Sequence, residues 1–116
     1  MRIRKANPKD FAEICGLIEK YADQGLLLPR TAEDIRAHLD RFLVLAKPQG
    51  PMSKEHLLGC VSLEPYGEEL AELRSLAVAP EARGFGAGAK LIAACMDLAR
   101  ERGISRLCRN TRARCV

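Results

Sequence analysis

Three glycines stand within five residues, at positions 84, 86 and 88, shortly after an apolar stretch that ends at Pro80. A loop that only reverses the chain needs one glycine, so a plain turn explains this stretch poorly. At the start of a helix, glycines leave backbone N–H groups bare and let another molecule approach them closely. Bare amides and the positive end of the helix dipole attract anions. The stretch therefore predicts a strand, a phosphate-binding loop and a helix, in that order.

Two well-known phosphate motifs do not fit this loop. A dinucleotide-binding fingerprint needs glycine at the position held by Ala89, together with a preceding β-α-β unit that the chain lacks. A Walker A motif needs Gly-Lys followed by serine or threonine, which does not occur here. Arg83, at the start of the loop, supplies charged hydrogen-bond donors. We therefore expect a pyrophosphate site of another kind.

The order of apolar patterns predicts one α/β domain. Strands are expected at 1–6, 42–46, 57–64, 70–78 and 104–108, and helices at 7–25, after Thr31, and from the glycine loop to about Arg102. Asn7 and Thr31 are the expected caps of the first two helices. Short links between the middle strands predict an antiparallel meander, whereas a helical crossover predicts that the last strand is parallel to its neighbour. The order β-α-α-β-β-β-α-β indicates a mixed sheet flanked by helices.

The net charge of +4 is not spread over the domain. Residues 1–99 hold 13 basic and 14 acidic side chains, whereas residues 100–116 hold six arginines and one glutamate. A nucleic-acid binder usually gathers basic side chains on one face and adds aromatic ones, but aromatic residues are only 4% of this chain. No apolar run approaches the roughly 18 residues of a membrane span. We expect neither nucleic acid nor a membrane as a partner.

The five cysteines, at 15, 60, 95, 108 and 115, form no Cys-x-x-Cys pair. Those on the expected helix faces and strand occupy positions for small apolar residues. We interpret the cysteines as free thiols in a reducing cytoplasm, and we expect no metal site. The two histidines, His38 and His56, lie far from the loop in sequence and are expected on the surface.

Residues 83–88, Arg-Gly-Phe-Gly-Ala-Gly, resemble the Arg/Gln-x-x-Gly-x-Gly/Ala acyl-CoA loop of the GNAT N-acetyltransferase superfamily, and residues 73–80 resemble the strand before it. The resemblance covers about residues 1–108 and implies a GNAT-like fold and an enzyme that uses acetyl-CoA as co-substrate. Residues 21–31 and 72–78 further resemble amino-acid N-acetyltransferases of the N-acetylglutamate synthase type. That likeness implies acetyl transfer to the α-amino group of an amino acid, with L-glutamate favoured, in arginine biosynthesis.

The same resemblance assigns roles to parts of the cofactor site. The main chain of Leu76, Ala77 and Val78 is expected along the pantetheine arm, with one strand N–H polarising the thioester carbonyl. The pyrophosphate is expected on the loop formed by Arg83, Gly84, Phe85, Gly86, Ala87 and Gly88.

Arg30 and Arg74 are the expected ligands of substrate carboxylates, because arginine can bind a carboxylate through two hydrogen bonds. Each has a second interpretation. Arg30 would otherwise be an exposed residue at a helix entry, and Arg74 would be the ion-pair partner of Glu72 on the same strand face. Glu72 is the candidate general base, with that ion pair as its alternative role.

The last residues depart from the family, whose members continue with an apolar strand and further elements where this chain is rich in arginine. We expect a partial GNAT domain at 1–108, incomplete at the C-terminus, and a non-family tail at 109–116. The strand at 70–78 would then have an unpaired edge, which offers a contact for a homo-oligomer. The alternative to an active enzyme is a truncated, non-catalytic acyl-CoA-binding module. A nucleic-acid binder acting through the tail is a third hypothesis, which the nearly neutral body disfavours.

Overall fold

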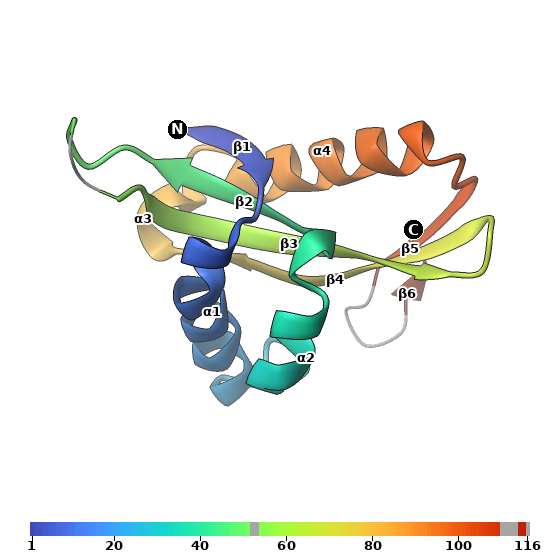
Figure 1. Ribbon diagram of the computed structural model, residues 1–116, viewed down its shortest axis with the longest axis horizontal. Helices are drawn as coiled ribbons and strands as arrows, with labels where there is room; N and C mark the ends of the chain where they lie inside the picture. Colours follow the sequence, from blue (N-terminus) through green and yellow to red (C-terminus); the bar gives the residue numbers. More distant parts are fainter. Residues whose placement is uncertain (52–53, 110–113, 116) are drawn as a thin grey trace.

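The computed structural model describes residues 1–51, 54–109 and 114–115 and contains a six-stranded sheet with the order β1-β2-β3-β4-β5-β6 (Figure 1). The strands are β1 (Arg2–Lys5), β2 (Phe42–Lys47), β3 (His56–Tyr66), β4 (Leu70–Val78), β5 (Arg106–Arg109) and β6 (Arg114–Cys115). The helices are η1 (Pro8–Asp10), α1 (Phe11–Asp23), α2 (Ala32–Ala37), η2 (Leu39–Arg41), α3 (Pro80–Arg83) and α4 (Ala87–Glu101). This mixed sheet with flanking helices confirms the predicted fold class.

The pairing of the strands also follows the prediction. β1 to β4 are antiparallel neighbours, and β5 lies parallel to β4 because α4 connects them. The strand expected at 57–64, with a turn from Pro65 onward, is too short, because Pro65 and Tyr66 continue β3 opposite Ala71 and Leu70. β2 pairs with β3 only as far as Ser62. Proline is therefore tolerated at 65, where the missing N–H removes no bond to β2.

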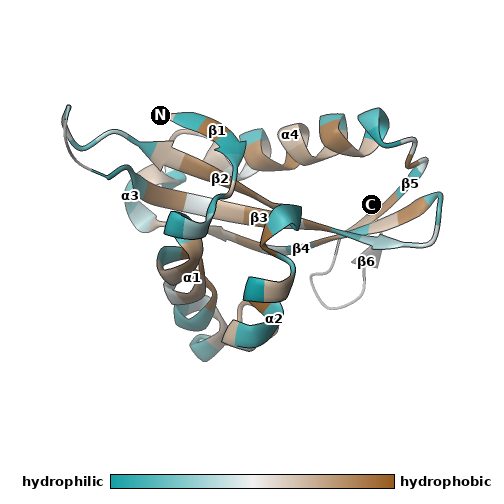
Figure 2. Ribbon diagram, viewed as in Figure 1, coloured by the Kyte–Doolittle hydropathy of each residue, from teal (hydrophilic) through white to brown (hydrophobic). Residues whose placement is uncertain are grey.

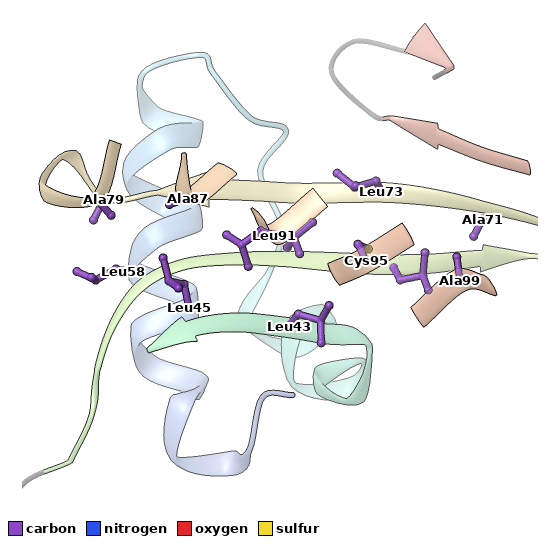
Figure 3. Close-up of a cluster of buried hydrophobic side chains, with 13 residues drawn as sticks. Leu43, Leu45, Leu58, Ala71, Leu73, Ala79, Ala87, Leu91, Cys95 and Ala99 are labelled. Carbon is purple, nitrogen blue, oxygen red and sulfur yellow. The ribbon is translucent and has the colours of Figure 1, made fainter. Parts of the chain in front are cut away.

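The sheet has one helical layer on each face (Figure 1). α1 and α2 pack on one face through a cluster that includes Ile14, Ile18, Ile35, Phe42 and Val44. α4 packs on the other face through Leu91, Cys95 and Ala99, which lie over Leu43, Leu45, Leu73 and other strand residues (Figure 3). Hydrophobic residues mark the central strands and parts of α1 and α4, whereas the loops at the ends of the strands are largely hydrophilic (Figure 2). Two apolar cores therefore clamp the sheet between its helices.

Local signals in the sequence explain where the helices begin. The Asn7 side chain accepts a hydrogen bond from Lys9 N–H, and Asp10 completes the capping box. Thr31 caps α2 by accepting from Asp34 N–H at 3.0 Å. Both predicted caps are confirmed.

Gly59 lets α4 lie close to the sheet. A Cβ atom at this position would lie 3.0 Å from both Ala77 O and Leu91 Cδ1. A larger residue would push the helix away from β3 and β4. The close approach fixes the start of α4 beside the end of β4.

The C-terminal end of the chain differs from one expectation about the cysteines. Cys15, Cys60 and Cys95 are free thiols, as expected, but Cys108 on β5 is disulfide-bonded. Of the expected tail at 109–116, residues 110–113 and 116 lie outside the described residues. The remaining residues of that tail end β5 and form the short strand β6. The division of the chain at residue 108 stays a prediction.

A buried ion pair ties β1 to the start of the first helical layer. The Asp10 side chain is 2% exposed and accepts two hydrogen bonds from the Arg4 guanidinium, at 2.7 and 3.1 Å. Burial alone raises the pKa of Asp10, but the hydrogen bonds from Arg4 and from Asn7 N–H outweigh it and lower the pKa below its ordinary value. The carboxylate is therefore a charged part of the folded state.

Replacing Asp10 with asparagine should lower the free energy of unfolding near neutral pH by roughly 2–4 kcal/mol, because Arg4 loses its buried counter-ion. The depressed pKa means that this contribution is present above about pH 4 and is lost as the pH falls through the folded pKa. The urea unfolding curves of wild type and variant should thus converge at pH values below the ordinary pKa of an aspartate. Glu55→Gln, at the exposed side of Arg4, is the control and should change little. Equal losses in the two variants would contradict this account.

Candidate functional site

The glycine loop ends in an uncapped helix N-terminus. α4 begins after Gly86, which has a left-handed backbone with φ of 68° and no side-chain cap. The first N–H groups of a helix have no intrahelical partner, and here they belong to Ala87, Gly88 and Ala89. The 15-residue helix also places the positive end of its dipole at this point. The predicted anion site is therefore present as bare donors at the end of β4.

The three glycines of the loop have different reasons to be glycine. Gly86 needs its positive φ, which other residues adopt at a cost. Gly84 has an ordinary helical φ of −75°, and a Cβ there would meet nothing within 4 Å. At Gly88 a Cβ would touch only Val78 Cγ2 at 3.8 Å. Folding therefore does not require glycine at 84 or 88. The N–H groups of Gly84 and Phe85 already donate to Ala82 O, so the bare amides are those of the first turn of α4.

Arg83 has partners that the sequence did not suggest. Its Nη2 donates to Tyr21 Oη at 2.7 Å, and its Nε donates to Val78 O at 3.3 Å. The Tyr21 hydroxyl donates to the same Val78 carbonyl at 2.7 Å. This arrangement ties α1 to the end of β4 and to α3, so Arg83 holds the base of the loop together. Phe85 is 63% exposed beside it.

β4 has a free edge just before the loop. β5 pairs with β4 only from Leu70 to Leu73, and no described strand lies on that side of residues 74–78. Ala79 N–H donates to Leu58 O on β3, so the alternation of a strand directs the N–H groups of Val78 and Leu76 to the free edge. Ala77, between them, packs in the core under α1. The free edge lies close to the bare amides of α4, because Gly88 in the first turn of that helix stands beside Val78 at the end of β4.

A bulge shapes this edge. Ser75 has a positive φ of 56°, and the pairing of β3 with β4 shifts register there. A non-glycine residue in this conformation is strained, and a bulge locally bends and twists its strand. The bulge lies two residues after the last pair of β4 with β5. It therefore begins the part of β4 that has no described strand on that side.

Arg30 reaches the bulge from the loop before α2. Its side chain is only 2% exposed, which corrects the interpretation of an exposed residue at a helix entry. Nε donates to Asp34 at 2.7 Å, and Nη1 donates to Ser62 Oγ at 3.1 Å and Ser75 Oγ at 3.3 Å. The same Nη1 lies 3.3 Å from Glu64 Oε2. The guanidinium is therefore fixed at the sheet next to β4.

One nitrogen of this guanidinium has no partner. Among the described side chains, Arg30 Nη2 is the buried polar atom without a hydrogen bond. Leaving such a charged donor unsatisfied costs free energy. Arg30 also lines a cavity of about 170 Å³ between α1 and α2. An acceptor on a ligand would satisfy Nη2.

Glu64 and Arg41 complete the cluster, and neither was singled out from the sequence. Glu64 Oε1 accepts from Arg41 at 2.9 Å, and its Oε2 accepts from Ser62 Oγ at 2.7 Å. Burial raises the pKa of Glu64, but the hydrogen bonds from Ser62 and Arg41 and the two guanidinium charges outweigh it, so the pKa lies below its ordinary value. A charged residue at the end of the apolar stretch 57–63 was the one available signal.

Arg74 and Glu72 form the ion pair that the sequence offered as their alternative role. Arg74 Nε lies 3.1 Å from Glu72 Oε1, which also accepts from Tyr66 Oη at 3.3 Å. Both residues lie on the strand that leads to the bulge at Ser75. The pair therefore stands within β4 close to Arg30, and a ligand role for either residue stays a prediction.

Other reactive groups of the described chain offer less. Burial raises the pKa of the Cys60 thiol to about 12, so it is a poor nucleophile. His38 and His56 pair with Asp34 and Glu13 at partly exposed positions. The described residues contain no group of His, Cys, Asp and Glu side chains that could hold a metal ion. Within the same residues, no helix is long and apolar enough to cross a membrane.

Known proteins share this architecture. The chain is 38% identical over 109 residues to an amino-acid acetyltransferase of Neisseria meningitidis serogroup A, which covers 90% of this chain and 23% of that protein. It is 33% identical over 103 residues to an uncharacterized N-acetyltransferase of Chlorobaculum tepidum, covering 89% of this chain and 63% of that protein. The N-acetylglutamate synthase of Neisseria gonorrhoeae, solved with coenzyme A and N-acetyl-glutamate, superimposes with a TM-score of 0.82 at 36% identity.

That superposition covers 91% of this chain and 24% of the synthase, so the chain spans about a quarter of the length of these amino-acid acetyltransferases. The profile of the acetyltransferase (GNAT) family matches residues 17–114, which include the second half of α1, Arg30 and its contacts, β4, the glycine loop and α4. Sequence, fold and loop therefore agree, and the chain belongs to the GNAT acetyltransferase family.

Proposed function

We propose that this chain transfers an acetyl group from acetyl-CoA to the α-amino group of an amino acid, L-glutamate above others, in arginine biosynthesis. The observation that carries the proposal is the free edge of β4, which runs into the bare amides of α4. A strand edge can pair with the amide groups of pantetheine, and a helix N-terminus can bind the pyrophosphate that follows. We place this reaction in the cytoplasm on the basis of the free thiols at Cys15, Cys60 and Cys95, although the disulfide of Cys108 is a bond that a reducing compartment disfavours.

In this proposal the backbone does most of the work on acetyl-CoA. The N–H groups of Leu76 and Val78 point to the free edge, where they bind pantetheine and polarise the thioester carbonyl. The loop from Gly84 to Gly88 holds the pyrophosphate, mainly through the bare N–H groups of Ala87 and Gly88, and Arg83 braces the loop. The strand and the helix fix these donors before the substrate arrives, so little reorganisation is needed during the reaction.

The substrate amine is proposed to lie beside the bulge of β4. Arg30 Nη2, the unsatisfied donor, binds a substrate carboxylate, and Arg74 is available to a second one. The neutral amine attacks the thioester carbonyl, and the C–S bond then breaks to release the CoA thiolate. Glu72 accepts the proton that the amine loses. The similarity to N-acetylglutamate synthase supports glutamate as the acceptor.

The purified chain should release thiol from acetyl-CoA when L-glutamate is added, and it should bind CoA in a calorimeter. Because an uncharged amine is needed, the rate should rise with pH over the range in which the amine loses its proton. If the chain binds CoA but acetylates no amino acid, it is a non-catalytic acyl-CoA-binding module and not an enzyme. Absence of CoA binding would refute both.

Substituting Gly88 tests the pyrophosphate site separately from the fold. Gly88→Glu places a carboxylate in the first turn of α4, where it stabilises the helix through its dipole but repels a phosphate. We expect the dissociation constant of CoA to rise by about tenfold or more, with an unchanged or higher melting temperature. Gly88→Ala is the matched control and should bind CoA nearly as wild type does, since its Cβ meets only Val78. Similar CoA affinity in wild type and Gly88→Glu would exclude this loop as the pyrophosphate site.

Substituting Arg30 tests the carboxylate site. Arg30→Lys keeps the charge but loses the planar pair of donors, so we expect the KM for glutamate to rise about 10-fold to 100-fold. The affinity for CoA should stay the same, because Arg30 does not touch the loop. Arg36→Lys makes the same change on an exposed position of α2 and should leave both constants unchanged. If Arg30→Lys loses affinity for CoA and Arg36→Lys does not, the substitution has damaged the fold and not only a substrate contact.

A further inference from the structure

Glu64 is a buried carboxylate to which the proposed reaction gives no role. Its side chain is 6% exposed and lies at the end of β3, on the face covered by α1 and α2. It contacts two guanidiniums, Arg41 at 2.9 Å and Arg30 at 3.3 Å. Ser62 donates to it from two residues away on the same strand. Glu64 is therefore the anion that Arg30 and Arg41 share.

The formal charges of the arginines and carboxylates that pair in this region cancel, before any protonation of His38, which lies 2.9 Å from Asp34. Three guanidiniums, of Arg30, Arg41 and Arg74, face three carboxylates, of Asp34, Glu64 and Glu72. An amino acid with an uncharged side chain brings one carboxylate and, as a reactive neutral amine, one negative charge. Glutamate brings a second negative charge. Each carboxylate of the cluster weakens the attraction that its arginines exert on that second charge.

Among these three carboxylates, Glu64 has the strongest influence on the electrostatic potential of the cluster. Its side chain is 6% exposed, compared with 37% for Asp34 and 19% for Glu72, so water screens its charge least. It also contacts Arg30, whose Nη2 has no partner. Changing the charge of Glu64 should therefore change the potential that a bound carboxylate experiences at Arg30.

We propose that Glu64 is a specificity-determining residue, whose negative charge limits the preference of the site for an anionic amino acid over its neutral amide analogue. This inference rests on the proposed amino-acid acetyltransferase activity. Glu64 acts on the substrate through the electrostatic potential of Arg30 and Arg41 and takes no part in the proton transfer. Glu64 thereby discriminates between substrates by the charge of their side chain, as between glutamate and glutamine.

The test compares kcat/KM for L-glutamate with that for L-glutamine in the same preparation, so that any inactive fraction cancels. Glu64→Gln keeps the shape and the hydrogen-bond acceptor but removes the charge. We expect the glutamate-to-glutamine ratio to rise about fivefold or more. Arg41→Gln removes a positive charge from the same cluster, and the ratio should fall. Glu68→Gln, in the exposed turn between β3 and β4, is the control and should leave the ratio unchanged.

The opposite signs separate an electrostatic role from a structural one. If Glu64 only anchors Arg30, Glu64→Gln will impair both substrates equally and the ratio will stay constant, which overturns the inference. A shift of the ratio in the same direction in both variants would overturn it too, because general disruption does not follow the sign of the charge. A wild-type chain that acetylates neither amino acid would refute the proposed function, and with it this inference.

Discussion

The end of the pairing between β4 and β5 at Leu73 is the constraint on which the rest of the site depends. All four residues of β5 pair with β4, and the last pair, Leu73 with Arg109, lies two residues before the bulge at Ser75. The N–H groups of β4 beyond this point face no described strand and remain available to a ligand. Two apolar layers keep the free edge in place, because α1 and α4 clamp β4 from its two faces. The core thus stabilises an exposed backbone edge that would be costly if it stayed unpaired.

Buried charge is the second theme of this structure. Arg4 and Asp10 form a purely structural ion pair. The Asp10 carboxylate accepts hydrogen bonds from the Arg4 guanidinium and from Asn7 N–H. The Arg30 cluster differs, because its acceptors satisfy Nε and Nη1 but not Nη2. A fully satisfied pair stabilises a fold, whereas an incompletely satisfied one fits a site that gains its last partner from a substrate. The bulge residue Ser75 links this cluster to the free edge, so acceptor and donor substrates would meet at one point of β4.

The sequence predicted the fold class, the caps at Asn7 and Thr31 and the parallel pairing of β4 with β5, because these follow from local patterns and short connections. It missed the continuation of β3 through Pro65, which depends on where β2 ends. It also missed the contacts of Glu64, Arg41 and Tyr21, since these join residues far apart in the chain. Arg30 was identified only through a resemblance, because an arginine before a helix gives no local sign of burial. Charge pairs between distant elements carry no periodic signal, and only the folded chain shows them.

A titration of the isotope-labelled chain with CoA, followed by amide chemical shifts, tests the central claim most directly. Glycine amides are readily distinguished in such spectra, so the signals of the glycine loop can be followed directly. If β4 and α4 form the cofactor site, the largest shifts will occur at Leu76, Val78, Gly86 and Gly88, and residues of β1 and β2 will hardly move. Large shifts confined to β1 and β2, with the amides of Leu76, Val78, Gly86 and Gly88 unmoved, would contradict the account.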